Sequence, residues 1–416
     1  MIMDHKTLTK VQQDSVNVLQ KNQISNPELT FTVASLTNPI YANMQAFWDS
    51  CFHAYILASI EPEIAKKEIM ALVKNMNEDG FIPHMIYFTG RGKIVPDNYK
   101  SILDSFWSSS YQSDLLQPPI LALAVNRIFE KTQDEEFLIQ ILPKLQKYYR
   151  YLSETRDHDK DGLLSIIHSW ESGWDNSQRW DSLYNIKKGQ RQEIDKQKAY
   201  LIKEYQKVDW KIEEIFDLGL FVIKPVDFNV LYAWNMEILS DMCEHVNLNN
   251  SFFKEQAHKT TQAIFKKMFD GEAFYDLDLD NNLSEVHSAA MFFPMLLNHQ
   301  FNYTDIINNY LKNDQHFSSP NGVPSTSLSH PLHSSNEYWR GNIWIQINWL
   351  IFRGLLFQKR SELATDLAKR IIRLLYNNGF WEYFNPQTGK GLGAGNYSWD
   401  SLVYSMVSYL KKSKVE

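Results

Sequence analysis

The chain has 416 residues, of which 44% are apolar and 14% aromatic, and its formal net charge is −7. This apolar content suffices for a large core, while the acidic balance argues against a nucleic-acid-binding protein, which normally carries a basic excess. No run approaches the ~18 apolar residues of a membrane span, and the polar N-terminus lacks a signal-peptide pattern. We therefore expect a cytoplasmic protein that binds neither nucleic acid nor membrane. The sequence is compatible with a homo-oligomer.

Apolar residues recur at helical spacing along most of the chain, which predicts an all-α fold. The expected helices form pairs joined by polar turns, and Asp134 is suited to cap one of them. Strand patterns are short and predict only small ribbons, at 82–89 and 271–277. The expected helices cover 46–58, 62–76, 115–129, 135–151, 228–246, 251–269, 288–297, 304–312, 344–357, 361–376 and 402–411.

The turns between the expected helices share a pattern. Gly80, Gly271 and Gly379 each follow a helix, and an apolar residue comes one or two positions later, as in left-handed C-terminal turns. Paired helices with such turns suggest a closed α/α toroid, in which the loops of one face form a site. We predict an N-terminal extension at 1–30 and one catalytic domain at 31–416.

Residues 182–224 interrupt this order. The segment is rich in Lys, Gln and Glu, and a helix is expected around Lys196–Lys207. Because we expect so polar a segment to build no core, it is either a solvated surface excursion or a mobile lid over the site. As a lid, its Lys187, Lys188 and Arg191 could contact an anionic part of a substrate.

The densest chemical signal is the segment WESGWDNSQRWD at residues 170–181. Such a concentration of rings and carboxylates suits a sugar site, where flat rings cover the sugar face and polar groups bind its hydroxyls. Asp175 is the candidate general acid, because burial against Trp raises the pKa of a carboxyl. A structural helix-capping role is the alternative. We expect Glu171 to brace this loop and Asp181 to pair with Arg179.

A glycosidase needs a second carboxylate across the sugar. Glu382 lies within the aromatic run FWEYF, where a surface Glu would be unusual, although a buried salt-bridge partner is the alternative. The following glycines, G-x-G-x-G at 391–395, do not follow an expected strand. A tight return that brings the backbone close to the site therefore fits better than a dinucleotide-binding loop.

Four segments together resemble glycoside hydrolase family 63. In chain order they are WDxxFHA beginning at Trp48, WESGWDNSxRWD, YWRGxxW beginning at Tyr338 and FxEYFxPxTGxG. This is also the order of the segments in the family. The resemblance is greatest to the small bacterial and plant branch that hydrolyses mannosylglycerate and glucosylglycerate. It implies a single (α/α)6 barrel, with Asp175 as general acid and Glu382 as general base.

The resemblance also implies a set of sugar-binding residues. Asp49 would bind sugar hydroxyls, although a helix N-terminal Asp is the alternative. Arg340 would hold the base carboxylate or an anionic substrate group, with a structural ion pair as the alternative. Gln112 offers an amide suited to sugar hydroxyls, and Trp344 a stacking platform. The remaining residues assigned to binding are Tyr41, Trp48, His84, Tyr87, Trp174, Gly341 and Trp381.

We expect neither a metal nor a cofactor. The run Asp157–Gly162 has the D-x-D-x-D-G pattern of a calcium loop, but His168 stands where the loop's Glu is required. A turn that enters the catalytic-acid segment is the better interpretation. Cys51 and Cys243 lie far apart in apolar contexts and are expected to be buried free thiols.

The sequence thus predicts an inverting hydrolase of a small α-glycoside, such as glucosylglycerate or mannosylglycerate. Two other functions stay open at this stage. One is a trehalase-like enzyme or another α-glucosidase of the same clan. The other is a non-catalytic toroid that binds sugar without hydrolysing it.

Overall fold

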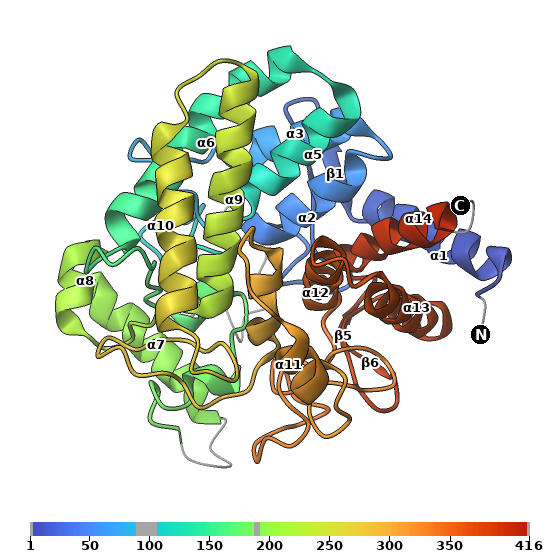
Figure 1. The fold of residues 1–416 in the computed structure, drawn as a ribbon. Helices are drawn as coiled ribbons and strands as arrows, with labels where there is room; N and C mark the ends of the chain where they lie inside the picture. Colours follow the sequence, from blue (N-terminus) through green and yellow to red (C-terminus); the bar gives the residue numbers. More distant parts are fainter. Residues whose placement is uncertain (1–2, 89–105, 187–191, 414–416) are drawn as a thin grey trace.

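The computed structural model describes residues 3–88, 106–186 and 192–413, which are mainly helical. Helices that are neighbours in sequence pack in pairs, as expected. The longest pair, α9 (Val226–His245) and α10 (Ser251–Lys267), lies side by side in Figure 1. Two further pairs are α2 (Phe47–Leu57) with α3 (Pro62–Val73), and α12 (Ile345–Phe357) with α13 (Ser361–Asn378).

Two boundaries show how local chemistry sets the helices. α6 (Glu135–Arg156) begins after Asp134, whose carboxylate accepts a hydrogen bond from the Phe137 N–H at 2.9 Å, which confirms the predicted cap. α5 (Leu121–Thr132) begins six residues later than the expected start at 115. The reason is the pair Pro118–Pro119, which lacks N–H donors and keeps the preceding residue out of the helical region.

Two expected α-helices take other helical forms. Residues 288–297 contain the 3-10 helix η4 (Ala289–Leu296), which includes Pro294. Residues 304–312 form one short helix, α11 (Thr304–Ile306), followed by the π-helix η5 (Ile307–Leu311). All eight residues of η4 are buried, so packing against α9 and α12 holds this segment despite its proline.

Three small antiparallel sheets complete the described fold. The expected ribbon at 82–89 is reduced to one two-residue strand among the described residues, and 271–277 forms only isolated bridges to its neighbours. The hairpin of the third sheet was not expected. The strand pairs are β1 (Gln23–Asn26) with β2 (Leu29–Thr32), β3 (Gln45–Ala46) with β4 (Met85–Ile86), and β5 (Trp381–Phe384) with β6 (Gly391–Gly395).

The two ends of the described chain pack together. The N-terminal region contains α1 (His5–Lys21), which lies beside the C-terminal helix α14 (Val403–Lys412) in Figure 1. Gln12 of α1 donates a hydrogen bond to the Ser408 hydroxyl at 3.5 Å. A 3-10 helix, η6 (Ser398–Leu402), precedes α14 and also contacts α1.

The segment 182–224 builds more core than its composition predicts. It contains α7 (Gln192–Lys207), which confirms the expected helix, and α8 (Ile212–Leu218). Our expectation that this polar segment builds no core is wrong, because helical spacing gathers its few apolar residues on one face. The buried ones in α7 are Ile194, Leu201, Ile202 and Tyr205. The predicted contacts of Lys187, Lys188 and Arg191 lie outside the described residues.

Candidate active site

A cavity of about 270 Å³ opens where the N-terminal end of α2 meets the segments before α12 and α14. This volume lies just below the ~300–1,000 Å³ of typical ligand pockets and therefore suits a small substrate. A surface hollow of about 540 Å³ between α9 and α10 is larger, but no Phe, Tyr or Trp side chain lines it. The rings of the cavity wall are Tyr41, Trp48, Tyr87, Trp107, Trp170, Tyr338, Trp339, Tyr397 and Trp399.

Asp175 lies in this cavity wall, in the loop between η2 (Ser169–Ser172) and η3 (Gln178–Trp180). The loop can approach the floor of the site because residue 173 is Gly, with φ of 72°. A Cβ there would lie 2.7 Å from the Trp48 ring. Glu171 braces the same loop, as predicted, because Arg156 donates two hydrogen bonds to it, at 2.6 and 2.9 Å.

Glu382 is placed by the β5–β6 hairpin. Its carboxylate accepts hydrogen bonds from the Tyr41 hydroxyl at 2.8 Å and from the Ala394 N–H at 3.0 Å. Gly393 has φ of 73°, and a Cβ at this position would collide with the Glu382 carboxylate. The glycine-rich run thus forms the predicted tight return, because only a backbone without side chains can approach the carboxylate this closely.

Trp381 lies outside the cavity, although we assigned it to sugar binding. Its neighbour Glu382 does not line the cavity either, but it bonds Tyr41, which does, whereas the Trp381 side chain lies against the glycines of β6. Its ring covers Gly391, where a Cβ would collide with it, and its side chain remains 36% exposed. Trp381 therefore packs on the outside of the hairpin.

Asp49 and His84 lie in the cavity wall, where the sequence placed them. Asp49 stands in the first turn of α2 and is only 3% exposed, and its Oδ1 has no hydrogen-bond partner among the described residues. His84 contacts the Ser113 hydroxyl through Nδ1 at 2.6 Å, while its buried Nε2 has no such partner. Burial lowers the pKa of His84 to about 3 and keeps the ring neutral. Both side chains offer polar atoms for sugar hydroxyls.

A stack of aromatic rings supports the cavity wall from behind. Trp339 lines the cavity, and Trp344 lies behind it, with ring centroids 3.6 Å apart and an interplanar angle of 3°. Trp174 contacts the same Trp339 ring at 5.1 Å, and Tyr383 contacts Trp344 at 4.9 Å. Trp344 and Trp174 were assigned to sugar binding, but neither lines the cavity. They contact rings of the cavity wall instead, Trp174 through Trp339, and Trp344 through Trp339, Tyr338 and Trp399.

The buried arginines pair differently from our expectation. Arg340 donates two hydrogen bonds to Asp181, at 2.9 and 2.6 Å, rather than to the Glu382 carboxylate. Its side chain does not line the cavity. The predicted pair of Asp181 with Arg179 is wrong. Arg179 instead bonds two buried carboxylates on other segments, Asp227 and Asp276. Both arginines anchor the loop that carries Asp175 to the surrounding fold.

Two further assigned residues also lie outside the cavity wall. Gln112 donates a hydrogen bond to the Asn77 side chain at 3.1 Å, because the bridge between residues 86 and 112 turns it away from the site. The amide that does line the cavity is Gln117, whose Oε1 accepts a hydrogen bond from the Trp48 N–H at 3.0 Å. Gly341 donates its N–H to the Ser325 hydroxyl at 3.1 Å and allows a close approach of His333.

The carboxyls of the site have raised pKa values. Burial raises the pKa of Asp175 to about 6, and the positive charge of Lys198 only partly offsets this effect. Burial likewise raises the pKa of Glu382 to about 7, opposed by the hydrogen bonds from Ala394 and Tyr41. Asp49 follows the same pattern, with a pKa of about 6. Carboxyls with such values can hold or release a proton near neutral pH, as acid–base catalysis requires.

A buried cation stands next to Asp175. The ammonium of Lys198, on α7, donates a hydrogen bond to the Asn176 side chain, next in sequence to Asp175. It also lies 5.6 Å from the centroid of Trp170, a ring of the cavity wall. The side chain of Lys198 is only 5% exposed. α7 therefore brings a positive charge to one side of the cavity.

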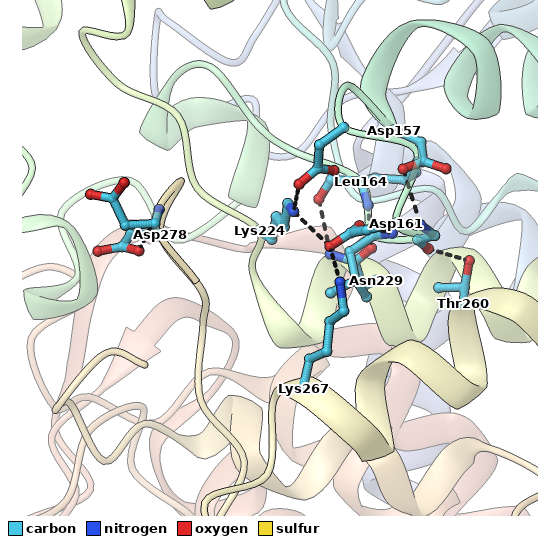
Figure 2. Close-up of polar contacts among 12 residues, drawn as sticks. Asp157, Asp161, Leu164, Lys224, Asn229, Thr260, Lys267 and Asp278 are labelled. Atoms are coloured by element: carbon cyan, nitrogen blue, oxygen red, sulfur yellow. Dashed lines mark hydrogen bonds and ion pairs between the residues drawn. The ribbon is translucent and has the colours of Figure 1, made fainter. Parts of the chain in front are cut away.

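A second group of carboxylates lies away from the cavity. Asp157, Asp159 and Asp161 bring one ligand oxygen each within 4.8 Å of one another, which is close enough for a shared cation. Lysines already bind these oxygens. Lys224 and Lys267 donate to Asp161 at 2.8 and 2.7 Å (Figure 2), Lys224 also donates to Asp159, and Lys259 donates to Asp157 at 2.8 Å. A metal ion would have to displace these ammonium groups.

Several cavity residues escaped the assignment from sequence. Tyr338, Trp339 and Trp399 stand in segments that resemble the family, but nothing in their spacing shows which rings face the site. Gln117 precedes two prolines and carries no sequence signal at all. The aromatic density of the segments was the only available indication.

Comparison with known proteins shows the family of this chain. The model of the mannosylglycerate hydrolase MGH1-like glycoside hydrolase domain matches residues 41–400. The mannosylglycerate hydrolase of Rubrobacter radiotolerans is 27% identical over 401 residues, 86% of this chain and 88% of that protein. The glucosylglycerate hydrolase of Mycolicibacterium hassiacum is 26% identical over 414 residues, 88% and 92% of the two chains.

A solved structure gives the corresponding result for the fold. The crystal structure of a family 63 mannosylglycerate hydrolase from Thermus thermophilus, in complex with Tris and D-glycerate, matches with a TM-score of 0.85. The match covers 96% of this chain and all of that one, at 23% identity. The family predicted from the sequence motifs is confirmed. Because the family model spans most of the chain, including the segments that carry Asp175 and Glu382, this protein belongs to the MGH1-like glycoside hydrolases.

Proposed function

We propose that this glycoside hydrolase inverts the anomeric centre of a small α-glycoside, with Asp175 as general acid and Glu382 as general base. The observation that carries the proposal is the pair of buried carboxyls with raised pKa values in and beside one aromatic-lined cavity. We also propose that the paired helices close into an (α/α)6 barrel around this cavity.

Each reacting group has a defined task. Asp175 gives its proton to the glycosidic oxygen as the bond to the sugar breaks. Glu382 removes a proton from a water that attacks the opposite face of the anomeric carbon. The Tyr41 hydroxyl keeps the base oriented, and the unpartnered Oδ1 of Asp49 accepts a hydrogen bond from a sugar hydroxyl.

The reaction requires a proton on Asp175 and none on Glu382. In the ligand-free site the two pKa values, about 6 and about 7, favour the opposite arrangement by about one unit. One unit corresponds to only about 1.4 kcal/mol. Substrate binding supplies this difference, because the glycosidic oxygen accepts a hydrogen bond from protonated Asp175.

We further propose that the leaving group carries a carboxylate of the glycerate type. Relatives with 26–27% identity are named as hydrolases of mannosylglycerate and glucosylglycerate. The site supplies a matching charge, because Lys198 places its buried ammonium beside the acid loop. We propose that residues 182–224, which carry this lysine, act as the cover of the aglycone side.

A hydrolysis panel tests the proposed activity. The purified enzyme is given mannosylglycerate, glucosylglycerate, trehalose and the p-nitrophenyl α-glucoside and α-mannoside. We expect the highest kcat/KM on one of the two glycosylglycerates. A preference for trehalose would favour the trehalase-like alternative, and binding without turnover of any substrate would favour a non-catalytic protein.

Replacement of the buried lysine tests the proposed leaving group. Lys198→Met should raise KM for the glycosylglycerate about tenfold or more, because a charged hydrogen bond to a carboxylate is lost. It should change KM for a neutral α-glycoside little. Lys196→Met is the matched control, since Lys196 lies on the same helix with 72% of its side chain exposed. Equal KM effects on both substrates would contradict the carboxylate contact.

A further inference from the structure

A second pocket lies toward the other end of a helix that carries the active site. The first turn of α2 brings Trp48 and Asp49 to the active cavity, and its last turn brings Tyr55 to a separate pocket of about 220 Å³. Residues of α5, α9 and α12 form most of the remaining wall of this second pocket. In the described part of the chain the two pockets share no lining residue.

Two arginines from different helices converge on the second pocket. Arg127 belongs to α5 and Arg353 to α12, and both line the pocket wall. Their guanidinium carbons lie over the same Tyr55 ring, at 5.1 and 5.6 Å from its centroid. The fold therefore gathers two permanent positive charges around one aromatic ring.

Arg353 has no acidic partner among the described residues. Its guanidinium makes one hydrogen bond there, to the Tyr55 hydroxyl, and otherwise packs over Trp234 and Trp349, with centroids at 5.8 and 5.3 Å. Rings contact the faces of a guanidinium, whereas its five N–H groups point outward in its plane. Most of these donors can therefore still bind an acceptor in the pocket.

The pocket wall contains one acidic residue, Glu130, and its carboxylate is already engaged. One oxygen accepts a hydrogen bond from Arg127 at 2.9 Å and the other from Asn126 at 3.0 Å. Arg127 also donates to the Ser59 hydroxyl at 3.2 Å, while its buried Nε has no partner among the described residues. A single carboxylate thus faces two guanidinium groups.

A neighbouring lysine indicates the same excess of positive charge. The pKa of Lys131, which follows Glu130 on α5, is lowered by the charge of Arg127, by burial and by the charge of Lys412, and the charge of Glu130 opposes this only in part. Although the whole chain has a net charge of −7, this region therefore carries positive charge that its own side chains leave uncompensated.

We propose that the second pocket binds a small anion whose carboxylate or phosphate group lies between Arg127 and Arg353. A guanidinium presents paired N–H donors that match two oxygens of either group. A volume of about 220 Å³ lies below that of typical ligand pockets and limits the ligand to a short carbon body. The rings of Tyr55 and Trp234 provide the apolar contact for that body. This binding is separate from the hydrolysis proposed above.

Titration calorimetry with inorganic phosphate and with acetate tests the site. Arg353→Met should raise the Kd of the tighter-binding probe ~10-fold or more, because charged hydrogen bonds to the anion are lost. Arg373→Met is the matched control, since Arg373 is exposed on α13 outside the pocket, and its Kd should be unchanged. Tighter binding of phosphate would identify a phosphate ester as the ligand class, and tighter binding of acetate a carboxylate.

Further variants separate anion binding from a structural role of the arginines. Arg127→Met should also raise Kd ~10-fold or more, and Arg353→Lys, which keeps the charge but not the paired donors, should give an intermediate Kd. Circular dichroism spectra verify the fold of each variant. Unchanged affinity in both methionine variants, or no binding of either probe by the unmodified protein, would overturn the proposal. Loss of binding in Lys198→Met instead would place the anion in the active cavity and would overturn it as well.

Discussion

Two groups of carboxylates in this protein meet opposite surroundings. Asp157, Asp159 and Asp161 face lysine ammonium groups, and hydrogen bonds from Lys224 and Lys267 help to lower the pKa of Asp161 to about 2. At Asp175 and Glu382 burial prevails and raises the pKa values to about 6 and 7, although the charge of Lys198 opposes it at Asp175 and hydrogen bonds from Tyr41 and the Ala394 N–H oppose it at Glu382. Asp161 is therefore ionised near neutral pH, whereas Asp175 and Glu382 can exchange a proton there.

We propose that the difference separates a structural role from a catalytic one. The lysine-bound group lies at the base of the catalytic-acid segment, where Lys224 joins the turn at 157–162 to the end of segment 182–224 (Figure 2). A carboxylate held by ammonium groups gains stability but cannot act as an acid near neutral pH. Where burial prevails, as at Asp175 and Glu382, both protonation states stay available near neutral pH.

The largest expected effect is the loss of catalysis when Asp175 or Glu382 is replaced. Asp175→Asn and Glu382→Gln should each lower kcat by ~10²–10⁴-fold, because each removes one proton-transfer group. Asp159→Asn is the matched control in the lysine-bound group and should keep kcat close to the unmodified value. Near-normal turnover in either of the first two variants would contradict its assigned role.

The lysine-bound group should respond in stability instead. Lys224→Met leaves the carboxylates of Asp159 and Asp161 with one fewer cation and should lower the free energy of unfolding by about 2–3 kcal/mol. Lys267→Met is the control, because its side chain is 34% exposed and should contribute about 0–1 kcal/mol. Denaturant unfolding of both variants measures the difference. Equally small decreases in the free energy of unfolding for both variants would mean that Lys224 contributes no more to stability than Lys267.

The pH dependence should reveal the shared proton of the catalytic pair. Below about pH 6 both Asp175 and Glu382 carry protons, so the base is lost, and above about pH 7 both are ionised, so the acid is lost. The kcat/KM profile should therefore be bell-shaped with its maximum between these values, which belong to the pair as a whole. A profile that is flat from pH 5 to pH 8 would contradict the two-carboxyl reaction.

The pKa shifts also predict opposite stability changes. The pKa of Asp161 is lowered on folding, so its stabilising contribution is present above the unfolded value of about 3.9 and is lost as pH falls toward 2. The pKa of Glu382 is raised to about 7, so its ionisation opposes folding as pH rises through that value. The difference in Tm between Glu382→Gln and the unmodified protein should therefore be more positive at pH 8 than at pH 5.

The sequence predicted helices and motifs better than side-chain directions. Apolar periodicity located the long helices, and the order of the motifs placed Asp49, Asp175 and Glu382 at one site. The sequence did not show that Trp381 points out of the β5–β6 hairpin, because that hairpin was not expected. It also assigned Arg340 to the site, although the partner of a buried arginine depends on which distant loop folds against it.

The segment 182–224 shows a different limit. Its average composition suggested a surface excursion, yet the apolar residues of α7 share one buried face, and Tyr205 donates a hydrogen bond to the Ile167 carbonyl at 2.6 Å. Composition alone does not register such spacing. The position of Lys198 beside the acid loop follows from this docking and was visible only in three dimensions.

The stereochemistry of the first product tests the central claim most directly. Proton NMR spectra recorded within the first minutes of hydrolysis of an α-glycoside distinguish the two anomers before they interconvert. Water that attacks opposite the leaving group, activated by Glu382, should release the β-sugar first. Initial release of the α-sugar would show that the bond is cleaved with retention, and would contradict the assignment of Asp175 and Glu382 as an inverting acid–base pair.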